Sequence, residues 1–392
     1  MKKDEVFANY NDYILSTYTR IPAIFVKGKG MILTDISGKK YLDFFPGWGV
    51  NNVGHCHPKV VAAVRDQIDK LIHIPNNFYH INQAKLAQQI VRHSFPAKIF
   101  FCNSGAEASE AAIKFVRAYG QGKRSEIITM VNSFHGRTLA ALSATGQKKH
   151  QKGFAPLVSG FKIIPFNDFK ILEETISEQT VAIMLELVQG EGGIHVAKPE
   201  YVRRIREICD EKNILLIFDE VQTGMGRTGE MFGFKNYDVR PDLMTLAKAL
   251  GGGLPIGALV VKKEIADTFQ PGMHACTFSG SPLLCKASLG VFKAIEKYKI
   301  LSNSRTMGVY LKKKLEELKE KFSCIKEVRG LGLMLGVELT VEGKNVVQEC
   351  FDYGLIINCT QGNTLRIMPA LNVTKKQIDK AVFILDKVFS KE

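Results

Sequence analysis

The chain lacks the sequence features of several large protein classes. No apolar run approaches the roughly 20 residues that a membrane helix requires, so no membrane contact is expected. There is no CxxC pair, and the cysteines stand singly, which indicates reduced intracellular thiols rather than a disulfide framework. Only His55-Cys56-His57 resembles a metal cluster. Adjacent residues cannot easily converge on one ion, so no metal site is expected.

Two nucleotide-binding fingerprints are also missing. The chain has no GxxxxGK[ST] segment and no GxGxxG segment after a strand, so ATPases and dinucleotide-dependent enzymes lack their signatures here. Residues 1–7 are charged and lack the apolar core of a signal peptide. A cytoplasmic location is therefore expected.

The net charge of +14 raises the question of nucleic-acid binding. The basic residues are spread along the chain and interleaved with acidic ones. The densest run, residues 312–314, lies on a helical pattern whose apolar stripe includes Leu311, Leu315 and Leu318, so it forms a solvated helix face. We expect the charge to attract small anions, and we expect no nucleic-acid partner.

Short apolar strands alternate with helical segments through the middle of the chain. The strand patterns lie at residues 98–102, 126–131, 180–185 and 213–218, and helical patterns lie at 107–119 and 199–212. This alternation predicts an α/β fold with a mostly parallel sheet covered by helices, whose ligands bind at the carboxyl ends of the strands. After about residue 290 a long helical pattern runs to about 322, and residues 327–338 follow as strands broken by glycine.

These patterns divide the chain into three parts. Residues 46–290 are predicted to form a large domain and residues 291–392 a smaller α/β C-terminal domain. Residues 1–45, with a short hairpin from residue 28 to residue 43, are predicted to pack partly with the small domain.

Lys248 is the most informative residue of the chain. It follows an apolar run and precedes Gly251-Gly252-Gly253, although lysines are rarely buried unless their charge is paired or consumed. Another apolar strand ends in Asp219-Glu220. A lysine that can form a Schiff base, with an aspartate at a neighbouring strand end, is the signature of a pyridoxal phosphate (PLP) site. The alternative is that Lys248 extends to solvent and Asp219 caps a helix.

Two further segments follow strands. Ser104-Gly105-Ala106-Glu107 opens a helix, where free backbone amides can bind phosphate, although Ser104 and Glu107 also fit a capping box. Residues 132–138 offer an aromatic ring that could stack on a flat cofactor and an arginine that could bind a carboxylate. A loop with a core Phe134 and a surface Arg137 is the simpler interpretation.

Several independent motifs occur in one order between about residue 18 and residue 371. They are Tyr18-Thr19-Arg20-Ile21-Pro22, Gly54-His55-Cys56-His57-Pro58, Asn103-Ser104-Gly105-Ala106-Glu107-Ala108, Phe134-His135-Gly136-Arg137-Thr138, Gln189-Gly190-Glu191-Gly192-Gly193, Asp219-Glu220-Val221-Gln222-Thr223-Gly224, residues 246–258 around Lys248, Thr277-Phe278 and Leu365-Arg366. In these motifs the chain resembles the class III, fold-type I PLP-dependent aminotransferases, and most closely their acetylornithine and ornithine branch.

The resemblance implies roles for the residues that bind PLP. Lys248 is expected to hold the cofactor as a Schiff base and to move the proton, and Asp219 to pair with the pyridine nitrogen. Phe134 is expected to stack on the ring, and Gln222 to lie near its phenolic oxygen. The phosphate is expected to bind at Ser104, Gly105 and Ala106, and at Thr277 of a partner subunit in a homodimer with shared active sites.

The resemblance also implies a substrate. Arg137 is expected to bind the carboxylate farther from the reacting amine, which is the α-carboxylate of N-acetylornithine in one half-reaction and the γ-carboxylate of glutamate in the other. Arg366 is expected to bind the α-carboxylate of glutamate or 2-oxoglutarate, and Tyr18 is expected to contact the substrate. Glu191 is expected to neutralise Arg366 when the donor has no carboxylate there. Glu186 is expected to support Asp219 or the strand ends, and His135 fits a structural loop residue equally well.

The implied reaction moves the δ-amino group of N-acetylornithine to 2-oxoglutarate, giving N-acetylglutamate semialdehyde and glutamate, in arginine biosynthesis. Ornithine, succinyl-diaminopimelate, 4-aminobutyrate and carrier-linked lysine are alternative donors that the same machinery serves. Trp48 departs from the family, whose ornithine branch has Tyr and whose acetylornithine branch has a smaller residue there. An aminomutase or decarboxylase on this fold would not need the pair of Glu191 and Arg366.

Overall fold

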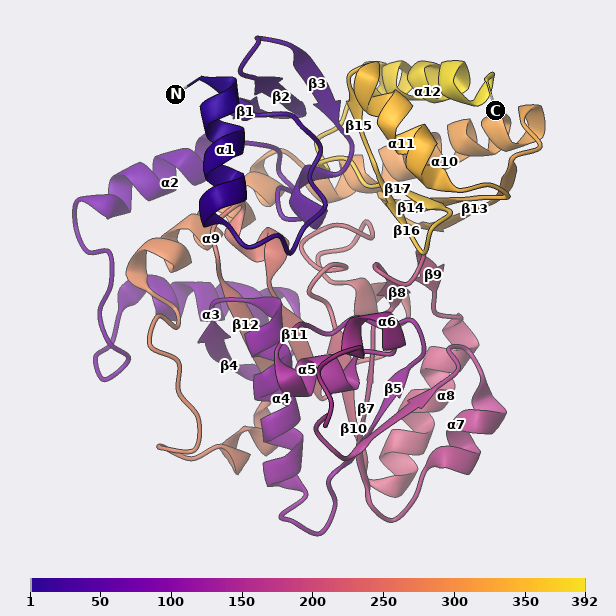
Figure 1. Ribbon diagram of the computed structural model, residues 1–392. Helices are drawn as coiled ribbons and strands as arrows, with labels where there is room; N and C mark the ends of the chain where they lie inside the picture. Colours follow the sequence, from indigo (N-terminus) through magenta and orange to yellow (C-terminus); the bar gives the residue numbers. More distant parts are fainter. Residues whose placement is uncertain (1, 392) are drawn as a thin grey trace.

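The computed structural model describes residues 2–391, and a seven-stranded sheet forms its centre (Figure 1). Its strands lie in the order β4 (Ala97–Cys102), β12 (Gly257–Lys262), β11 (Leu243–Leu246), β10 (Leu215–Asp219), β7 (Thr180–Leu185), β5 (Glu126–Met130) and β6 (Phe161–Ile164). Only β12 runs antiparallel to its neighbours. The four strand patterns named from the sequence all lie in this sheet.

The sheet is buried on both faces. In β10, Leu215 and Ile217 pack into the core beneath α4 (Gly105–Tyr119), whereas Leu216 and Phe218 pack into the core beneath α8 (Pro199–Lys212). Alternate side chains of a strand point to opposite faces, so a strand covered twice is apolar throughout. The expected mostly parallel sheet with helices on both faces is confirmed.

Further helices surround the sheet and connect its strands. They are α2 (Pro58–Ile68), α3 (Ile81–His93), α5 (Leu139–Ala144), α6 (Lys148–Gln151), α7 (Phe169–Thr175) and α9 (Pro282–Lys297), with the 3-10 helices η2 (Gly233–Asn236), η3 (Lys248–Gly251) and η4 (Lys263–Thr268). In the part of the chain that is described, no helix is long and apolar enough to cross a membrane.

The C-terminal part forms a second sheet covered by three helices. The sheet has the order β13 (Ile325–Leu331), β14 (Met334–Leu339), β17 (Thr364–Ile367) and β16 (Asn358–Thr360), and its helices are α10 (Ile300–Lys321), α11 (Gly343–Asp352) and α12 (Lys375–Phe389). The prediction of one long helix to about residue 322 is wrong. The chain turns at Lys299, whose φ is +50°, so α9 and α10 are separate helices.

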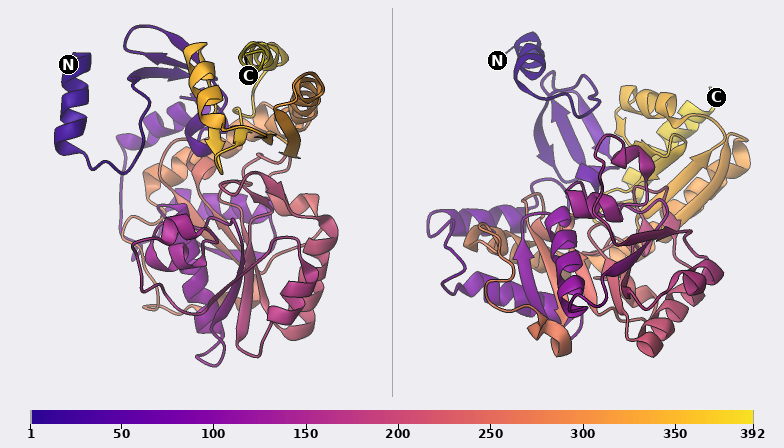
Figure 2. Two further views of the ribbon diagram at one scale, coloured as in Figure 1. Left: turned by 45° about the vertical axis from the view of Figure 1, so that its right-hand side comes forward. Right: turned by 60° about the horizontal axis from the view of Figure 1, so that its bottom comes forward.

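The N-terminal part joins the C-terminal part through a third sheet (Figure 2). After α1 (Lys3–Tyr13) come β1 (Phe25–Lys29), β2 (Ile32–Asp35) and β3 (Lys40–Asp43), and β3 pairs in parallel with β15 (Leu355–Ile356). The short helix η1 (Pro46–Trp48) then connects β3 to the helices that surround the large sheet. This pairing supports the proposed packing of residues 1–45 with the small domain, and the domain boundaries themselves stay a prediction.

Candidate active site

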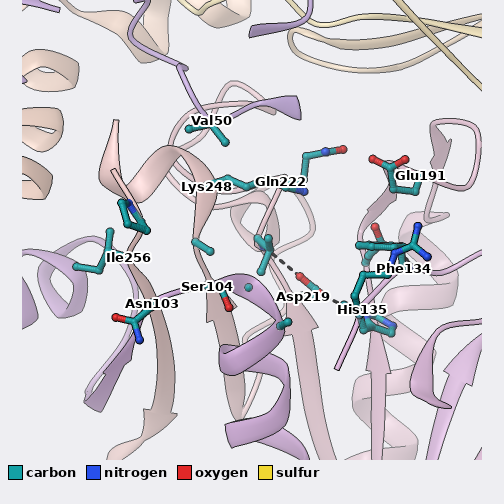
Figure 3. A pocket seen from close by; sticks show the side chains of 18 of the residues that line it. Val50, Asn103, Ser104, Phe134, His135, Glu191, Asp219, Gln222, Lys248 and Ile256 are labelled. Carbon is teal, nitrogen blue, oxygen red and sulfur yellow. Dashed lines mark hydrogen bonds and ion pairs between the residues drawn. The ribbon is translucent and has the colours of Figure 1, made fainter. Parts of the chain in front are cut away.

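A cavity of about 460 Å³ lies at the carboxyl ends of the central strands (Figure 3). Because parallel strands end at one edge of a sheet, residues far apart in the sequence meet there. The sequence-predicted residues that line the cavity are Ser104, Gly105, Ala106, Phe134, Arg137, Glu191, Asp219, Gln222 and Lys248. The structure therefore brings nine of the residues named from the sequence into one site.

Lys248 follows β11 and opens η3 at the bottom of this cavity. Its φ is +43°, a left-handed conformation that non-glycine residues seldom adopt and that is concentrated at functional sites. The exposed part of its side chain faces the cavity. Its Nζ makes no hydrogen bond or ion pair with any described residue. Burial lowers the pKa of Lys248, although the charges of Glu191, Asp219 and Glu186 oppose this shift. The lysine is thus set to carry a reactive neutral amine.

Asp219 ends β10 and is nearly buried, with His135 beside it. His135 Nδ1 lies 2.7 Å from Asp219 Oδ2, and the Val221 backbone N–H donates to Asp219 Oδ1 at 3.1 Å. Burial opposes charge on His135, but the hydrogen bond and the charge of Asp219 outweigh it and raise the pKa of His135. The Nε2 atom of His135 is buried without a hydrogen-bond partner. His135 therefore orients the carboxylate of Asp219.

Glu186 follows β7 and joins two loops of the site. It accepts hydrogen bonds from the backbone N–H of Phe134 at 2.9 Å and of Gly190 at 3.2 Å. Burial and the nearby charge of Asp219 raise the pKa of Glu186 to about 7, against the effect of His135. The sequence suggested that Glu186 supports the strand ends. Glu186 also lines the cavity, so it contacts the site as well.

The start of α4 offers backbone donors to the cavity. The amides of Gly105 and Ala106 belong to the first turn, where no intrahelical acceptor exists. Ser104 Oγ accepts from the Glu107 N–H at 3.2 Å, but the Glu107 carboxylate binds the N–H of Asn103 rather than that of Ser104. The expected capping box is therefore only half formed. A Cβ on Gly105 would lie 2.8 Å from Val221, so only glycine fits this approach.

Gln222 and Phe134 both form part of the cavity wall. Gln222 Nε2 donates to the Trp48 carbonyl at 3.1 Å, and its Oε1 is buried with no partner. Phe134 presents its ring to the cavity beneath the exposed guanidinium of Arg137, 5.4 Å from the ring centre. Arg137 makes no hydrogen bond or ion pair with the described residues, so it is open to an anionic ligand.

Arg366 lies beside the cavity on β17 and reaches it through Glu191. Its Nη1 donates to Glu191 Oε1 at 2.6 Å, and its Nε and Nη2 donate to Asn358 Oδ1 at 2.8 and 2.5 Å. The Phe45 ring centre lies 4.6 Å from the guanidinium carbon. Burial opposes the charge of Glu191, but Arg366 outweighs it and lowers the pKa of Glu191.

Besides Arg366, three residues named from the sequence lie outside this cavity. Tyr18 is 65% exposed on the segment before β1, and Thr277 is exposed on the loop before α9. Trp48 is also partly exposed and contacts Phe45 edge-on. Within one subunit, therefore, the structure does not bring Tyr18, Thr277 or the Trp48 ring to Lys248.

The comparisons with known proteins agree with this geometry. The model of the family described as aminotransferase class III matches residues 13–389. The chain belongs to the class III aminotransferase family. It is similar to the acetylornithine aminotransferase of Methanocaldococcus jannaschii, with 54% identity over 96% of each chain. The solved ornithine aminotransferase of Toxoplasma gondii ME49 has a TM-score of 0.96 and 31% identity, covering 100% of this chain and 96% of that one.

Class III aminotransferases depend on PLP, and this aminotransferase has the groups that the cofactor requires. A second structure of the T. gondii enzyme, with a TM-score of 0.95 and 31% identity over 99% of this chain and 94% of that one, is described with partial occupancy of PLP at its active site. In the present cavity, an unpaired lysine, free amides at the start of α4 and the unpartnered Gln222 Oε1 fit such a ligand.

Sequence reasoning missed some residues of the site. Asn358, which holds Arg366, and Phe45, which stacks on it, come from segments without a motif that would mark them. From the sequence, Glu186 is expected only to support Asp219 or the strand ends, and His135 has no definite role. Their signal is position, because Glu186 directly follows β7 and His135 lies on the loop after β5, and both line the cavity.

Proposed function

We propose that this aminotransferase transfers the δ-amino group of N-acetylornithine to 2-oxoglutarate, giving N-acetylglutamate semialdehyde and glutamate, as a step of arginine biosynthesis. The observation that carries the proposal is the similarity of nearly the whole chain to proteins named acetylornithine aminotransferase, at 54%, 50% and 45% identity. A cavity with one open arginine and one arginine covered by a carboxylate supports it.

Lys248 and Asp219 perform the central proton chemistry in this proposal. PLP, when bound, supplies an electron sink that allows the carbon bearing the amine to lose a proton. Lys248 would hold the cofactor through Nζ and then move the proton, for which its lowered pKa is suited. Asp219, oriented by His135, would hold a proton on the pyridine nitrogen. Ser104, Gly105 and Ala106 would bind the phosphate and Phe134 would cover the ring.

The two arginines separate the two substrates by where each carries its carboxylate. N-Acetylornithine carries its carboxylate far from the reacting amine, where the open guanidinium of Arg137 would bind it. Tyr18 would join this end of the site in the assembled dimer. Glu191 meanwhile keeps Arg366 neutralised. 2-Oxoglutarate carries a carboxylate at each end. For this substrate Glu191 would move aside, Arg366 would bind the carboxylate beside the reacting carbon, and Arg137 would bind the distal carboxylate.

The exposures of the pair agree with this division. The Glu191 side chain keeps 24% exposure on the turn between β8 (Val188–Gln189) and β9 (His195–Val196), whereas Arg366 keeps 2%. Arg366 is fixed by Asn358, so Glu191 is the partner that can move. An unpaired buried charge costs several kcal/mol, which explains why the arginine is covered when no substrate carboxylate is present.

The donor half-reaction tests the proposal. Holoenzyme is mixed with N-acetylornithine, ornithine, 4-aminobutyrate or succinyl-diaminopimelate, and loss of the cofactor's visible absorbance is followed in the absence of an acceptor. We expect the fastest conversion with N-acetylornithine. Conversion with another donor alone would keep the chemistry and reject this substrate, and Trp48 would then be the first position to exchange.

We also propose that the enzyme is a cytoplasmic homodimer in which Thr277 of each subunit completes the partner's phosphate site. Ile72, Phe78 and Tyr79 on one segment and Phe278 on another are exposed apolar side chains that support a subunit contact there. The two segments adjoin, because Asn76 Nδ2 donates to the Ser279 carbonyl at 2.9 Å. Mixing subunits with Lys248→Ala and subunits with Thr277→Ala tests this. A mixed dimer contains one complete site, so activity should return on mixing, and its failure to return would reject shared sites.

A further inference from the structure

A second cavity, of about 470 Å³, lies behind the hairpin that carries Glu191. It is lined by Val131, Asn132, Pro165, Phe166, Asn167, Gln189, His195, Val196, Glu327 and Arg329. The β8–β9 hairpin contributes to both cavities, because Glu191 at its turn lines the first and Gln189 and His195 on its strands line the second. In Figure 1 this hairpin lies where the large domain meets β13.

Hydrogen-bonding groups in the second cavity lack partners. The side chains of His195 and Asn132 make no hydrogen bond with any described residue. Arg329 Nη2 has only a long contact of 3.4 Å, to Thr364 Oγ1, although Arg329 Nη1 binds Glu327 and Glu338. Polar groups without partners in a concave site indicate a polar ligand.

Two of these donors point to the same place. A Cβ built on Gly193 would lie 3.2 Å from His195 Nε2 and 3.4 Å from Arg329 Nη2, so both nitrogens lie close together on the side of this glycine where a side chain would stand. Its φ of +108° keeps the position free of a side chain. Burial and the charge of Arg329 lower the pKa of His195, so a neutral imidazole and a guanidinium face the space together. A carboxylate fits such a pair.

The other residues that line the second cavity indicate the remaining parts of the ligand. Glu327 uses one oxygen for Arg329 and lies at the rim with a side chain 51% exposed, so its other oxygen can accept from a cation. Val131, Pro165, Phe166 and Val196 provide apolar wall. Ion pairs join Arg329 to Glu327 and Glu338, and Glu338 to Lys326, so the charges of this group sum to zero, which favours a ligand that carries both signs.

We propose that the second cavity binds a free α-amino acid with a short apolar side chain, its carboxylate at His195 and Arg329 and its ammonium group at Glu327. Such a ligand would act on the active site through the hairpin, because Arg329 Nε donates to the Gly193 carbonyl at 2.9 Å, two residues from Glu191. An amino acid whose carboxylate binds Arg329 would weaken the hydrogen bond from Arg329 to Gly193. The turn would then loosen, and Glu191 would bind Arg366 less tightly. The binding does not depend on the identity of the donor, whereas the coupling to Glu191 rests on the proposed function.

Calorimetric titration of holoenzyme with L-valine tests the binding. 3-Methylbutanoate, which lacks the ammonium group, and 2-methylpropylamine, which lacks the carboxylate, serve as matched probes. The visible absorbance of the cofactor reports any reaction in the active site. We expect one valine per subunit without a change in absorbance, and binding at least about tenfold weaker for either probe.

Two variants locate the site. His195→Phe keeps the ring volume and removes the donor, and Glu327→Gln removes the charge at an exposed position where folding is not at risk; each should weaken valine binding at least about tenfold. Glu316→Gln, on α10, is the matched control and should bind as the parent does. Absence of heat, equal binding of 3-methylbutanoate, or unchanged binding by both cavity variants would overturn the proposal.

The coupling has its own readout. At a concentration that just saturates the parent, valine should lower the KM for 2-oxoglutarate by at least about fivefold in the parent and by clearly less in Glu327→Gln. Valine binding with an unchanged KM would overturn the coupling. If valine binds while N-acetylornithine gives no half-reaction, the donor assignment fails and the second site stands.

Discussion

Two basic side chains of this chain, Lys248 and Arg227, have opposite kinds of surroundings. Arg227 is fully buried, and its guanidinium donates to the carbonyls of Leu333 at 2.9 Å and Pro369 at 2.6 Å and to the Asn52 side chain. Burial lowers the pKa of Arg227 to about 9. Lys248 has no hydrogen-bond partner and opens into a cavity.

The difference separates structure from chemistry. Both terminal nitrogens of Arg227 donate to neutral acceptors from three separate segments, so this residue holds those segments together. Lys248 is desolvated without such bonds, which leaves an amine ready to react. Arg366 lies between these cases, because Asn358 fixes it while its charge is balanced by the movable Glu191.

Removing the unpartnered cation should abolish catalysis and leave the fold intact. Lys248→Ala deletes the group that holds the cofactor and moves the proton, so we expect turnover to fall by at least about 10⁴-fold. Because no hydrogen bond is lost, the thermal midpoint should stay within a few degrees of the parent's. Single-turnover kinetics and thermal melts measure the two effects. A folded Lys248→Ala enzyme with substantial activity would exclude Lys248 from the chemistry.

Removing the cation whose terminal nitrogens are bonded should have the reverse effect. Arg227→Met keeps much of the volume but leaves the Leu333 and Pro369 carbonyls and the Asn52 amide oxygen without their donor. We expect the free energy of unfolding to fall by about 4 kcal/mol, since each buried acceptor left unsatisfied costs about 1–3 kcal/mol. Urea unfolding measures this loss, and activity per folded molecule should be nearly unchanged. A variant as stable as the parent would remove the contrast between the two cations.

Much of the fold and of the cavity floor could be predicted from the sequence. Strands without polar residues indicated a sheet covered on both faces, and Asp219 and Lys248 stood out because each is a charged residue at the end of such a strand. Since parallel strands end at one edge, their meeting followed from the fold class alone. The resemblance to the family then added Phe134, Gln222 and Arg137, which line the same cavity.

Other features depend on contacts that no local pattern contains. Arg366 and Glu191 are 175 residues apart and lie on different sheets, and only the family resemblance paired them. Asn358 carries no motif, although it holds the guanidinium of Arg366. The break between α9 and α10 falls at Tyr298-Lys299, where neither glycine nor proline marks it. Thr277 stays a prediction because its proposed partner belongs to a second subunit.

The buried acid beside Lys248 should make stability depend on pH. Burial raises the pKa of Glu186 from its ordinary 4.5 to about 7, and the pKa of neighbouring His135 is also raised. Between pH 4.5 and about 7 the folded chain keeps a proton that unfolded Glu186 has lost, so stability is greatest below this window and falls as pH rises through it. His135 acts in the same direction.

We expect a fall on the order of 2 kcal/mol across the window in urea unfolding of cofactor-free protein. Glu186→Gln cannot ionise, so its unfolding free energy should change less over the same range, with only the contribution of His135 remaining. A parent whose stability rises between pH 5 and pH 7 would contradict the raised pKa.

The smallest effect should come from changing Glu191, the movable partner of Arg366. Glu191→Gln keeps a hydrogen-bond acceptor for Arg366 and removes the balancing charge. The unneutralised guanidinium should then favour 2-oxoglutarate and disfavour N-acetylornithine, so we expect the ratio of the two KM values to shift by about tenfold, or about 1.4 kcal/mol, with little change in kcat. Glu349→Gln is the matched control, because Glu349 also forms an ion pair, with Lys391 at 2.7 Å, and has a similar exposure of 32%. If both KM values rose together, Glu191 would be a structural partner like those of Arg227, and the selection between substrates would lie elsewhere in the cavity.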